Sequence, residues 1–266
     1  MRRLLTFACE GAELGATLDA GDGATGLVMV TGGSQTRIGS HRMYERLASE
    51  LAKRGISCLR FDRRGVGDSA GEDPGFRGSG PDIAAAAALL RTQCPGVERL
   101  YGFGLCDGAT ALAQFGDAAG LDGLVMVNPW LVETEAGAPP PAAIRRHYRQ
   151  RLLSREGWRR ILSGAVDYRK LLSGVKKIVR RREIAPLARE VAAALARHGL
   201  PTRLVLATGD ATAIAAEAEM KNSIFRGLAG EAHKIDSDSH TFARPGDDAA
   251  LLEAVLDAVG KLTSSR

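Results

Sequence analysis

The sequence contains little cysteine, few aromatic residues and no long hydrophobic run. Its four cysteines show neither the spacing of a metal site nor the density of a disulfide scaffold in a secreted protein. No stretch approaches the roughly 20 apolar residues that cross a bilayer, and the short apolar run at the N-terminus is interrupted by Glu10. We therefore expect a cytoplasmic protein that needs no metal ion and no cofactor.

Positive charge is concentrated in one segment of the chain. Residues 145–183 hold fourteen Lys and Arg against three acidic residues, whereas the whole chain has a net charge of only +5. Such a segment attracts anions. A solvated arginine-rich face, docking of an acidic acyl carrier protein, binding of a CoA phosphate and contact with an anionic membrane surface are the open alternatives. Nucleic acid is not expected, since the segment matches no recognised nucleic-acid-binding motif or fold.

Strand-like apolar runs alternate with helical segments along most of the chain. After a first hairpin (residues 4–8 and 14–18), strands are expected at 26–30, 56–61, 97–103, 124–127, 203–207 and 232–235, and helices at 41–54, 82–92, 107–115, 187–197, 213–220 and 249–262. Ser40 is the expected N-cap of the first helix. Repeated strand–helix units predict an α/β fold with a mostly parallel sheet and helices on both faces.

The alternation is interrupted between residues 131 and 183. This part contains a proline run at 139–141 and continues as a basic amphipathic helical pattern. We interpret it as a helical lid inserted between two strands of the sheet. Residues 1–130 and 184–266 together then form a single core domain.

A candidate nucleophile lies in the run Gly104-Leu105-Cys106-Asp107-Gly108, between an apolar strand and an alanine-rich helix. This is the context of a nucleophile elbow, G-x-S-x-G, with cysteine in place of serine. So sharp a turn strains its central residue and leaves room only for small residues beside it. Peptide N–H groups at the start of the helix favour a thiolate and an oxyanion. Cys106 is therefore the predicted nucleophile, a buried cysteine in a glycine-rich turn being the alternative.

A nucleophile of this kind needs a base, and the base needs an orienting group. His240 follows the last expected strand, and Asp210 follows the strand before it. This matches the order of nucleophile, acid and histidine that accompanies the elbow. The rival acid position holds Asn128, which cannot carry the charge that stabilises an imidazolium. We predict that His240 is the base and Asp210 its partner; the alternatives are a solvated loop histidine and a helix N-cap.

Two backbone N–H groups are needed to stabilise the negative charge that develops on the acyl oxygen. One is expected from Asp107, directly after the nucleophile. The other is expected from the loop of residues 32–35, with Ser34 preferred to Gly33. Further contacts with the substrate are expected from Gln35, Arg37 and Trp130. The arginine would hold a substrate carboxylate or phosphate, an ordinary surface arginine being the alternative.

Together with the D-x-R-G-x-G-x-S turn of residues 62–69, these motifs resemble the α/β-hydrolase superfamily over the sheet portions of nearly the whole chain. In that superfamily the turn is chiefly structural. Residues 32–42, 104–108, 128–130 and 158–164 are more closely similar to exosortase A system-associated hydrolase 1, a family that accommodates cysteine at the elbow. This resemblance implies a setting among bacterial exopolysaccharide and protein-sorting genes, and no particular substrate.

Cysteine at the elbow favours particular chemistry. A thiolate attacks an acyl carbon readily, so we expect hydrolysis of a thioester or an activated ester through an acyl-thioester enzyme intermediate. The acyl compound would be free or carried on CoA or an acyl carrier protein. The same residues allow acyl transfer to a sugar or amine acceptor. A hydrolase-fold protein without activity, serving as a scaffold, is the alternative from a different class.

Overall fold

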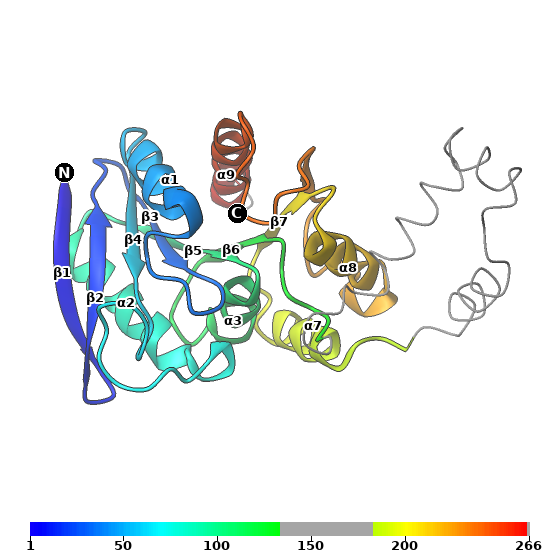
Figure 1. Ribbon diagram of the computed structural model, residues 1–266, viewed down its shortest axis with the longest axis horizontal. Coiled ribbons are helices and arrows are strands. Elements are labelled where there is room, and N and C mark those ends of the chain that lie inside the picture. Colours follow the sequence, from blue (N-terminus) through cyan, green and yellow to red (C-terminus); the bar gives the residue numbers. More distant parts are fainter. Residues whose placement is uncertain (134–182, 265–266) are drawn as a thin grey trace, which may run out of the picture.

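The computed structural model describes residues 1–133 and 183–264 of the chain. The inserted lid expected at 131–183 therefore lies almost entirely outside the described residues, and its helical character stays a prediction. The described residues form one sheet with helices packed on both faces (Figure 1).

The sheet has eight strands in the order β1-β2-β4-β3-β5-β6-β7-β8. The first hairpin pairs antiparallel, and β2 pairs antiparallel with β4; all other neighbours are parallel. The strands are β1 (Arg2–Cys9), β2 (Ala12–Asp19), β3 (Thr25–Val30), β4 (Ile56–Phe61), β5 (Arg99–Leu105), β6 (Gly123–Val127), β7 (Thr202–Ala207) and β8 (His233–Ile235). The expected mostly parallel sheet is confirmed.

Helices cover the two faces of the sheet unequally. Helices α1 (Met43–Ala52) and α9 (Asp247–Ser264) pack on one face, and α2 (Gly80–Gln93), α3 (Asp107–Phe115), α7 (Pro186–His198) and α8 (Ala211–Met220) pack on the other. Figure 1 shows α1 and α9 above the sheet and α2, α3 and α7 below it.

The central strands are buried because both of their faces meet helices. In β3, Val28 and Val30 face the helices of one side while Leu27 and Met29 face those of the other. Alternate side chains of a strand point to opposite faces, so an uninterrupted apolar run is what a strand between two helical layers requires. The apolar runs recognised in the sequence therefore correspond to the middle of the sheet.

The expected start of the first helix is wrong by two residues. A short 3-10 helix spans Ser40–Arg42, α1 begins at Met43, and the Ser40 side chain does not cap it. Gly39, His41 and Arg42 all have positive φ, so the chain bends before the α-helix can begin. The local sequence pattern is compatible with a helical first turn, but the bend carries the His41 side chain toward residue 241 instead.

The segment 134–182 separates two neighbouring strands of the sheet. Strand β6 precedes it and β7 follows it, yet the two pair in parallel, with Leu124 opposite Thr202 and Val127 opposite Val205. On the helical layer below, α3 packs against α7. The core is therefore continuous across the insertion.

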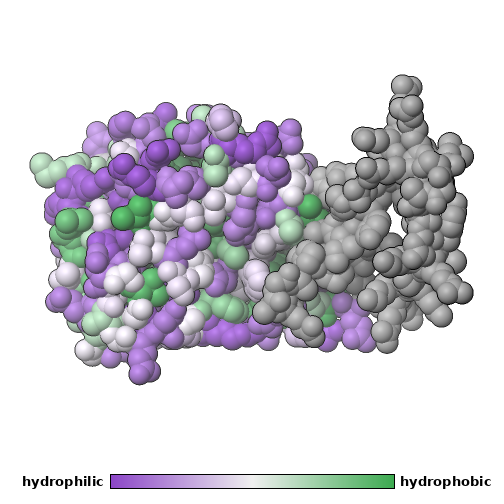
Figure 2. Space-filling model, viewed as in Figure 1, coloured by the Kyte–Doolittle hydropathy of each residue, from purple (hydrophilic) through white to green (hydrophobic). Residues whose placement is uncertain are grey.

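The surface of the described residues is mainly polar. The large hydrophobic side chains that are exposed are Met1, Leu4, Ile38 and Ile224. Figure 2 shows a largely hydrophilic face with scattered hydrophobic spots. Within the two described ranges, no helix combines the length and the apolar character that a membrane crossing requires.

Candidate active site

Cys106 occupies a strained turn between the end of β5 and the start of α3. Its backbone has φ 60° and ψ −127°, a combination that a residue with a side chain rarely adopts. A Cβ on Gly104 would lie 2.7 Å from the backbone of Gly108, and one on Gly108 would lie 2.5 Å from the carbonyl oxygen of Val30. Only glycine fits at both positions. The G-x-C-x-G spacing is thus a packing requirement of the turn.

The imidazole of His240 lies between Cys106 and Asp210. Its Nδ1 is 3.0 Å from Oδ2 of Asp210, and the Cys106 thiol lies close enough to raise the pKa of the imidazole. Asp210 is buried and also accepts the backbone N–H of Ala213 at 2.9 Å, so it caps α8. The carboxylate therefore makes both a contact with the histidine and a helix cap, which the sequence offered as alternatives. The three side chains predicted for catalysis meet at one edge of the sheet.

The environment of His240 favours the imidazolium form. Burial is the largest single influence on its pKa and acts to lower it. Hydrogen bonds to Asp210 and Cys106, together with the attraction of their negative charges, act in the opposite direction and prevail, so that the pKa rises to about 10.

Asn128 holds the loop of His240 in place. It follows β6 directly, is fully buried and has φ 41°. Its Nδ2 donates to the backbone carbonyl of His240 at 3.0 Å, and its Oδ1 accepts the backbone N–H of Ala207 at 2.8 Å. Sequence reasoning weighed this residue only as a possible acid and missed its structural role. The available signal was an asparagine directly after a buried strand, because asparagine tolerates a positive φ.

A second contact reaches the same loop from the 3-10 turn before α1. Nε2 of His41 is 2.8 Å from the backbone carbonyl of Thr241, the residue after His240. Phe242, the next residue, is buried with φ 58°. The histidine loop is therefore held by hydrogen bonds from both Asn128 and His41.

The loop Gly32–Gln35, which we call the oxyanion loop, lies directly against the elbow. A Cβ on Gly32 would come within 2.9 Å of the Cβ of Cys106. The N–H of Gly33 donates to Oδ1 of Asp107 at 2.6 Å, whereas that of Ser34 meets no acceptor within residues 1–133 and 183–264. Of the two candidates from the oxyanion loop, Ser34 is the one with a free N–H.

The remaining expected contacts are placed differently. Arg37 pairs with the carboxylate of Asp62 and, at 2.7 Å, with that of Asp68, and its side chain is largely buried. It stabilises the turn after β4, and a role in substrate binding stays a prediction. Gln35 accepts the backbone N–H of Ser40 through Oε1 at 3.3 Å. The backbone N–H of Trp130 donates to the carbonyl of Cys106 at 3.1 Å, which puts this residue beside the elbow.

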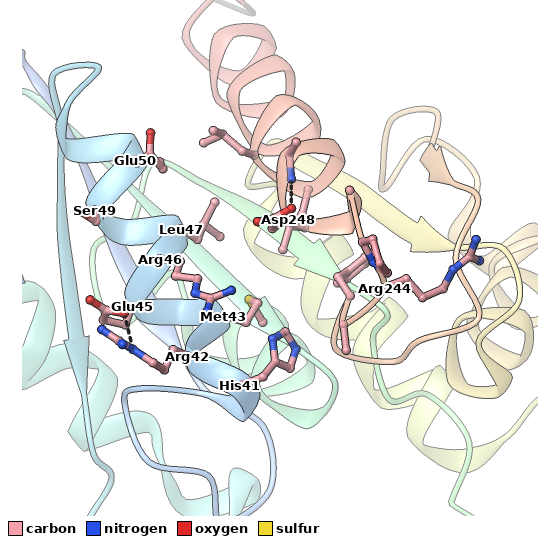
Figure 3. A pocket seen from close by; sticks show the side chains of 17 residues that line it. His41, Arg42, Met43, Glu45, Arg46, Leu47, Ser49, Glu50, Arg244 and Asp248 are labelled. Carbon is pink, nitrogen blue, oxygen red and sulfur yellow. Dashed lines mark hydrogen bonds and ion pairs between the residues drawn. The ribbon is translucent and has the colours of Figure 1, made fainter.

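A separate groove of about 740 Å³ lies next to the histidine loop, between α1 and α9. Figure 3 shows Arg46 of α1 and His41 of the turn before it on one side of the groove, and Arg244 on the other. None of the three side chains of the triad lines it. Among the described residues, no three or more His, Cys, Asp or Glu side chains are grouped so as to hold a metal ion.

A family model for the alpha/beta hydrolase family matches residues 27–257. The chain belongs to this family. The match spans the elbow, the acid and the histidine, so the arrangement just described occupies the region that an α/β hydrolase uses for its active site. A search among curated proteins gave no match.

Solved structures show the same α/β-hydrolase fold. The esterase Pf2001 of Pyrococcus furiosus is 14% identical, with a TM-score of 0.64 over 98% of this chain and 91% of that chain. Est1E of Butyrivibrio proteoclasticus, solved with ferulic acid, is 15% identical, with a TM-score of 0.61 over 97% of this chain and 100% of that chain. XC6422 of Xanthomonas campestris, described as a serine hydrolase without lid, is 16% identical, with a TM-score of 0.58 over 98% and 94%.

Proposed function

We propose that this α/β hydrolase is an acyl hydrolase that uses Cys106 as nucleophile, His240 as acid–base group and Asp210 as the orienting acid. The observation that carries the proposal is the His240 imidazole hydrogen-bonded to the Asp210 carboxylate at 3.0 Å, with the thiol of the strained elbow residue Cys106 near enough to raise the pKa of the ring. Acyl-transfer enzymes use this arrangement, in which a base activates the nucleophile and a third group orients the base.

The first half of the reaction forms an acyl enzyme. The Cys106 thiolate attacks the acyl carbon, and the electron pair of the C=O bond moves to oxygen, where the N–H groups of Asp107 and Ser34 stabilise the charge. When the C=O bond reforms, the bond to the leaving group breaks, and the imidazolium of His240 donates its proton to that group. The product is a thioester on Cys106, and His240 becomes neutral.

The second half releases the acid. Neutral His240 takes a proton from water as the water oxygen attacks the thioester carbon. Collapse of the tetrahedral intermediate breaks the C–S bond and regenerates the thiolate beside the imidazolium. An alcohol or amine acceptor in place of water gives acyl transfer by the same steps, so the chemistry of the acceptor distinguishes the two activities.

The cysteine favours substrates with a good leaving group. A thiolate adds readily to thioesters and activated esters, whereas an amide or a simple lipid ester needs more help to expel its leaving group. One of the similar structures is named an esterase, which supports an ester-type substrate. The resemblance to exosortase A system-associated hydrolase 1 supports an exopolysaccharide or protein-sorting setting. Docking of CoA, a carrier protein or an anionic membrane at the basic segment stays a prediction, because residues 134–182 lie outside the described part.

A rapid-quench experiment with an acyl aryl thioester tests the proposal. Intact-mass analysis should detect an acyl adduct on the wild-type protein within the first turnover and none on Cys106→Ala. Cys94→Ala is the matched control, since Cys94 is also partly exposed and should leave adduct formation unchanged. A wild-type protein that never carries an adduct, or a Cys106→Ala variant that turns over normally, contradicts the proposal. Acylated sugar or amine in a parallel incubation identifies a transferase.

A further inference from the structure

Arg63, the second residue of the turn after β4, lies buried against the oxyanion loop. Its side chain is only 3% exposed, and the nearest carboxylate, that of Asp73, is 3.6 Å away. Its Nη2 donates to the backbone carbonyl of Gly33 at 2.5 Å. The close partner of this guanidinium is thus a carbonyl of the oxyanion loop.

The other donors of the guanidinium are poorly satisfied. Nε and Nη1 of Arg63 are buried, and neither meets an acceptor among the residues that the structure describes. A buried charge with unpaired donors costs free energy, and an apolar side chain of similar volume is often at least as stable in such a place. Packing alone therefore does not account for an arginine at this position.

The bond from Arg63 determines which way a neighbouring N–H points. The carbonyl of Gly33 and the N–H of Ser34 belong to one planar trans peptide, in which the two groups point in opposite directions. On the other side of Gly33, its own N–H is fixed by Asp107 at 2.6 Å. Both peptide planes that flank Gly33 are therefore held, and the φ of +58° at this residue suits glycine. The donor left free is the N–H of Ser34.

We propose that Arg63 is a positioning residue that directs the Ser34 N–H into the oxyanion hole by holding the carbonyl of Gly33. The inference rests on the proposed acyl-transfer function. Without Arg63 the peptide can rotate, as the carbonyl has lost its donor, and the N–H no longer meets the developing negative charge. The effect belongs to the transition state, because a planar acyl group in the ground state needs this donor much less.

Arg63→Met tests the inference, because it keeps the length of the apolar stem and removes the donor. Loss of an oxyanion donor costs about 10²- to 10³-fold in kcat, so a donor that is only misdirected should cost about 10- to 100-fold, with KM nearly unchanged. The affinity for an acyl trifluoromethyl ketone, which forms a tetrahedral adduct with the thiolate, should fall by a similar factor. The affinity for the corresponding planar amide should not change. Arg63→Lys should recover part of kcat, since an ammonium can also donate to a carbonyl.

Arg60→Met is the matched control for burial. Arg60 is 1% exposed, lies on β4, pairs with Asp19 at 2.9 Å and donates to the backbone carbonyl of Arg37 at 3.0 Å, beyond the oxyanion loop itself. This variant should lose stability while keeping the ratio of the two inhibitor affinities. If Arg63→Met keeps the kcat and the ketone affinity of the wild type, Arg63 is a structural residue and the inference is wrong. The same holds if its kcat and its ratio of inhibitor affinities equal those of Arg60→Met.

A readout without turnover separates this inference from the proposed function. If none of the acyl substrates tried acylates the wild-type protein, only the proposed function is contradicted. Protein labelled with ¹³C-carbonyl glycine and ¹⁵N-serine then reports the Gly33–Ser34 peptide, identified as the signal lost in Ser34→Ala. This signal should move in Arg63→Met and stay in place in Arg60→Met. An unmoved signal in Arg63→Met overturns the positioning role.

Discussion

At the scale of single residues, Asp210 combines a structural and an electrostatic task. Its Oδ2 accepts the N–H of Ala213 at the start of α8 and also faces Nδ1 of His240. Asparagine caps a helix about as well as aspartate. Replacement by asparagine therefore removes the charge and leaves the cap.

Asp210→Asn should lower the pKa of His240 well below its value of about 10, because burial then acts without the opposing carboxylate. The imidazolium–thiolate pair should be lost at a lower pH, so the alkaline fall in kcat/KM should move toward neutrality. At its optimum the variant should be about 10²- to 10⁴-fold slower. The pH profile of kcat/KM and an NMR titration of the histidine measure both effects. An unshifted alkaline limb would show that Asp210 does not set this pKa.

The residues of the triad could be predicted from the sequence because each follows a recognisable strand in a fixed order. The elbow glycines are recognisable because no other residue fits there. Asn128, His41 and Arg63 could not be predicted in the same way. Their partners are carbonyl groups at residues 240, 241 and 33, and no pattern in the sequence records which carbonyl a side chain will reach.

At the scale of elements, Asn128 joins the ends of β6 and β7 to the loop between β8 and α9. Its removal leaves a buried N–H of Ala207 and the carbonyl of His240 without their partner. Both groups are backbone atoms that position the catalytic loop. Stability and activity are therefore linked at this residue.

Asn128→Ala should destabilise the protein by about 2–4 kcal/mol, because two buried backbone groups lose their hydrogen bonds. Asn128→Gly should cost about 1 kcal/mol less, since glycine accepts a φ of 41° without strain. Both variants should also lose about tenfold in kcat, as His240 is less well held. Urea denaturation and steady-state kinetics measure the two effects. Equal stability of the two variants would show that the backbone at this position is not strained.

The order of the strands could be predicted only in part. Alternating strands and helices predict a parallel sheet, and this is confirmed. The sequence does not show that β4 lies between β2 and β3, because each pairing is decided by contacts between distant segments. The first turn of α1 was misplaced for a related reason, since a bend at Gly39 and a contact with residue 241 override the local helical pattern.

At the scale of the whole molecule, the raised pKa of His240 makes folding depend on pH. The pKa rises from 6.5 in an unperturbed histidine to about 10 in the folded protein. A group whose pKa is raised on folding stabilises the folded protein fully at a pH below the pKa of the unfolded state. This stabilisation is lost as the pH rises through the pKa of the folded state. The relevant range is therefore pH 6.5 to 10.

The free energy of unfolding of the wild type should exceed that of His240→Gln most at about pH 6, and the difference should shrink steadily toward pH 10. Denaturant titrations of both proteins at several pH values measure this difference. A gap that stays constant over the range would show that the interactions of His240 with Asp210 and Cys106 do not depend on its charge in the folded protein.

The pairing of β6 with β7 across the insertion has a practical consequence. The thiol belongs to the part of the chain before residue 134, while the carboxylate and the imidazole belong to the part after residue 182. Two polypeptides that end and begin at these points each carry an incomplete set of reacting groups. A mixture of the two pieces would turn over substrate only if β6 and β7 paired again. Fusing each piece to one of two interacting proteins therefore makes a reporter in which enzyme activity indicates that the two proteins have bound.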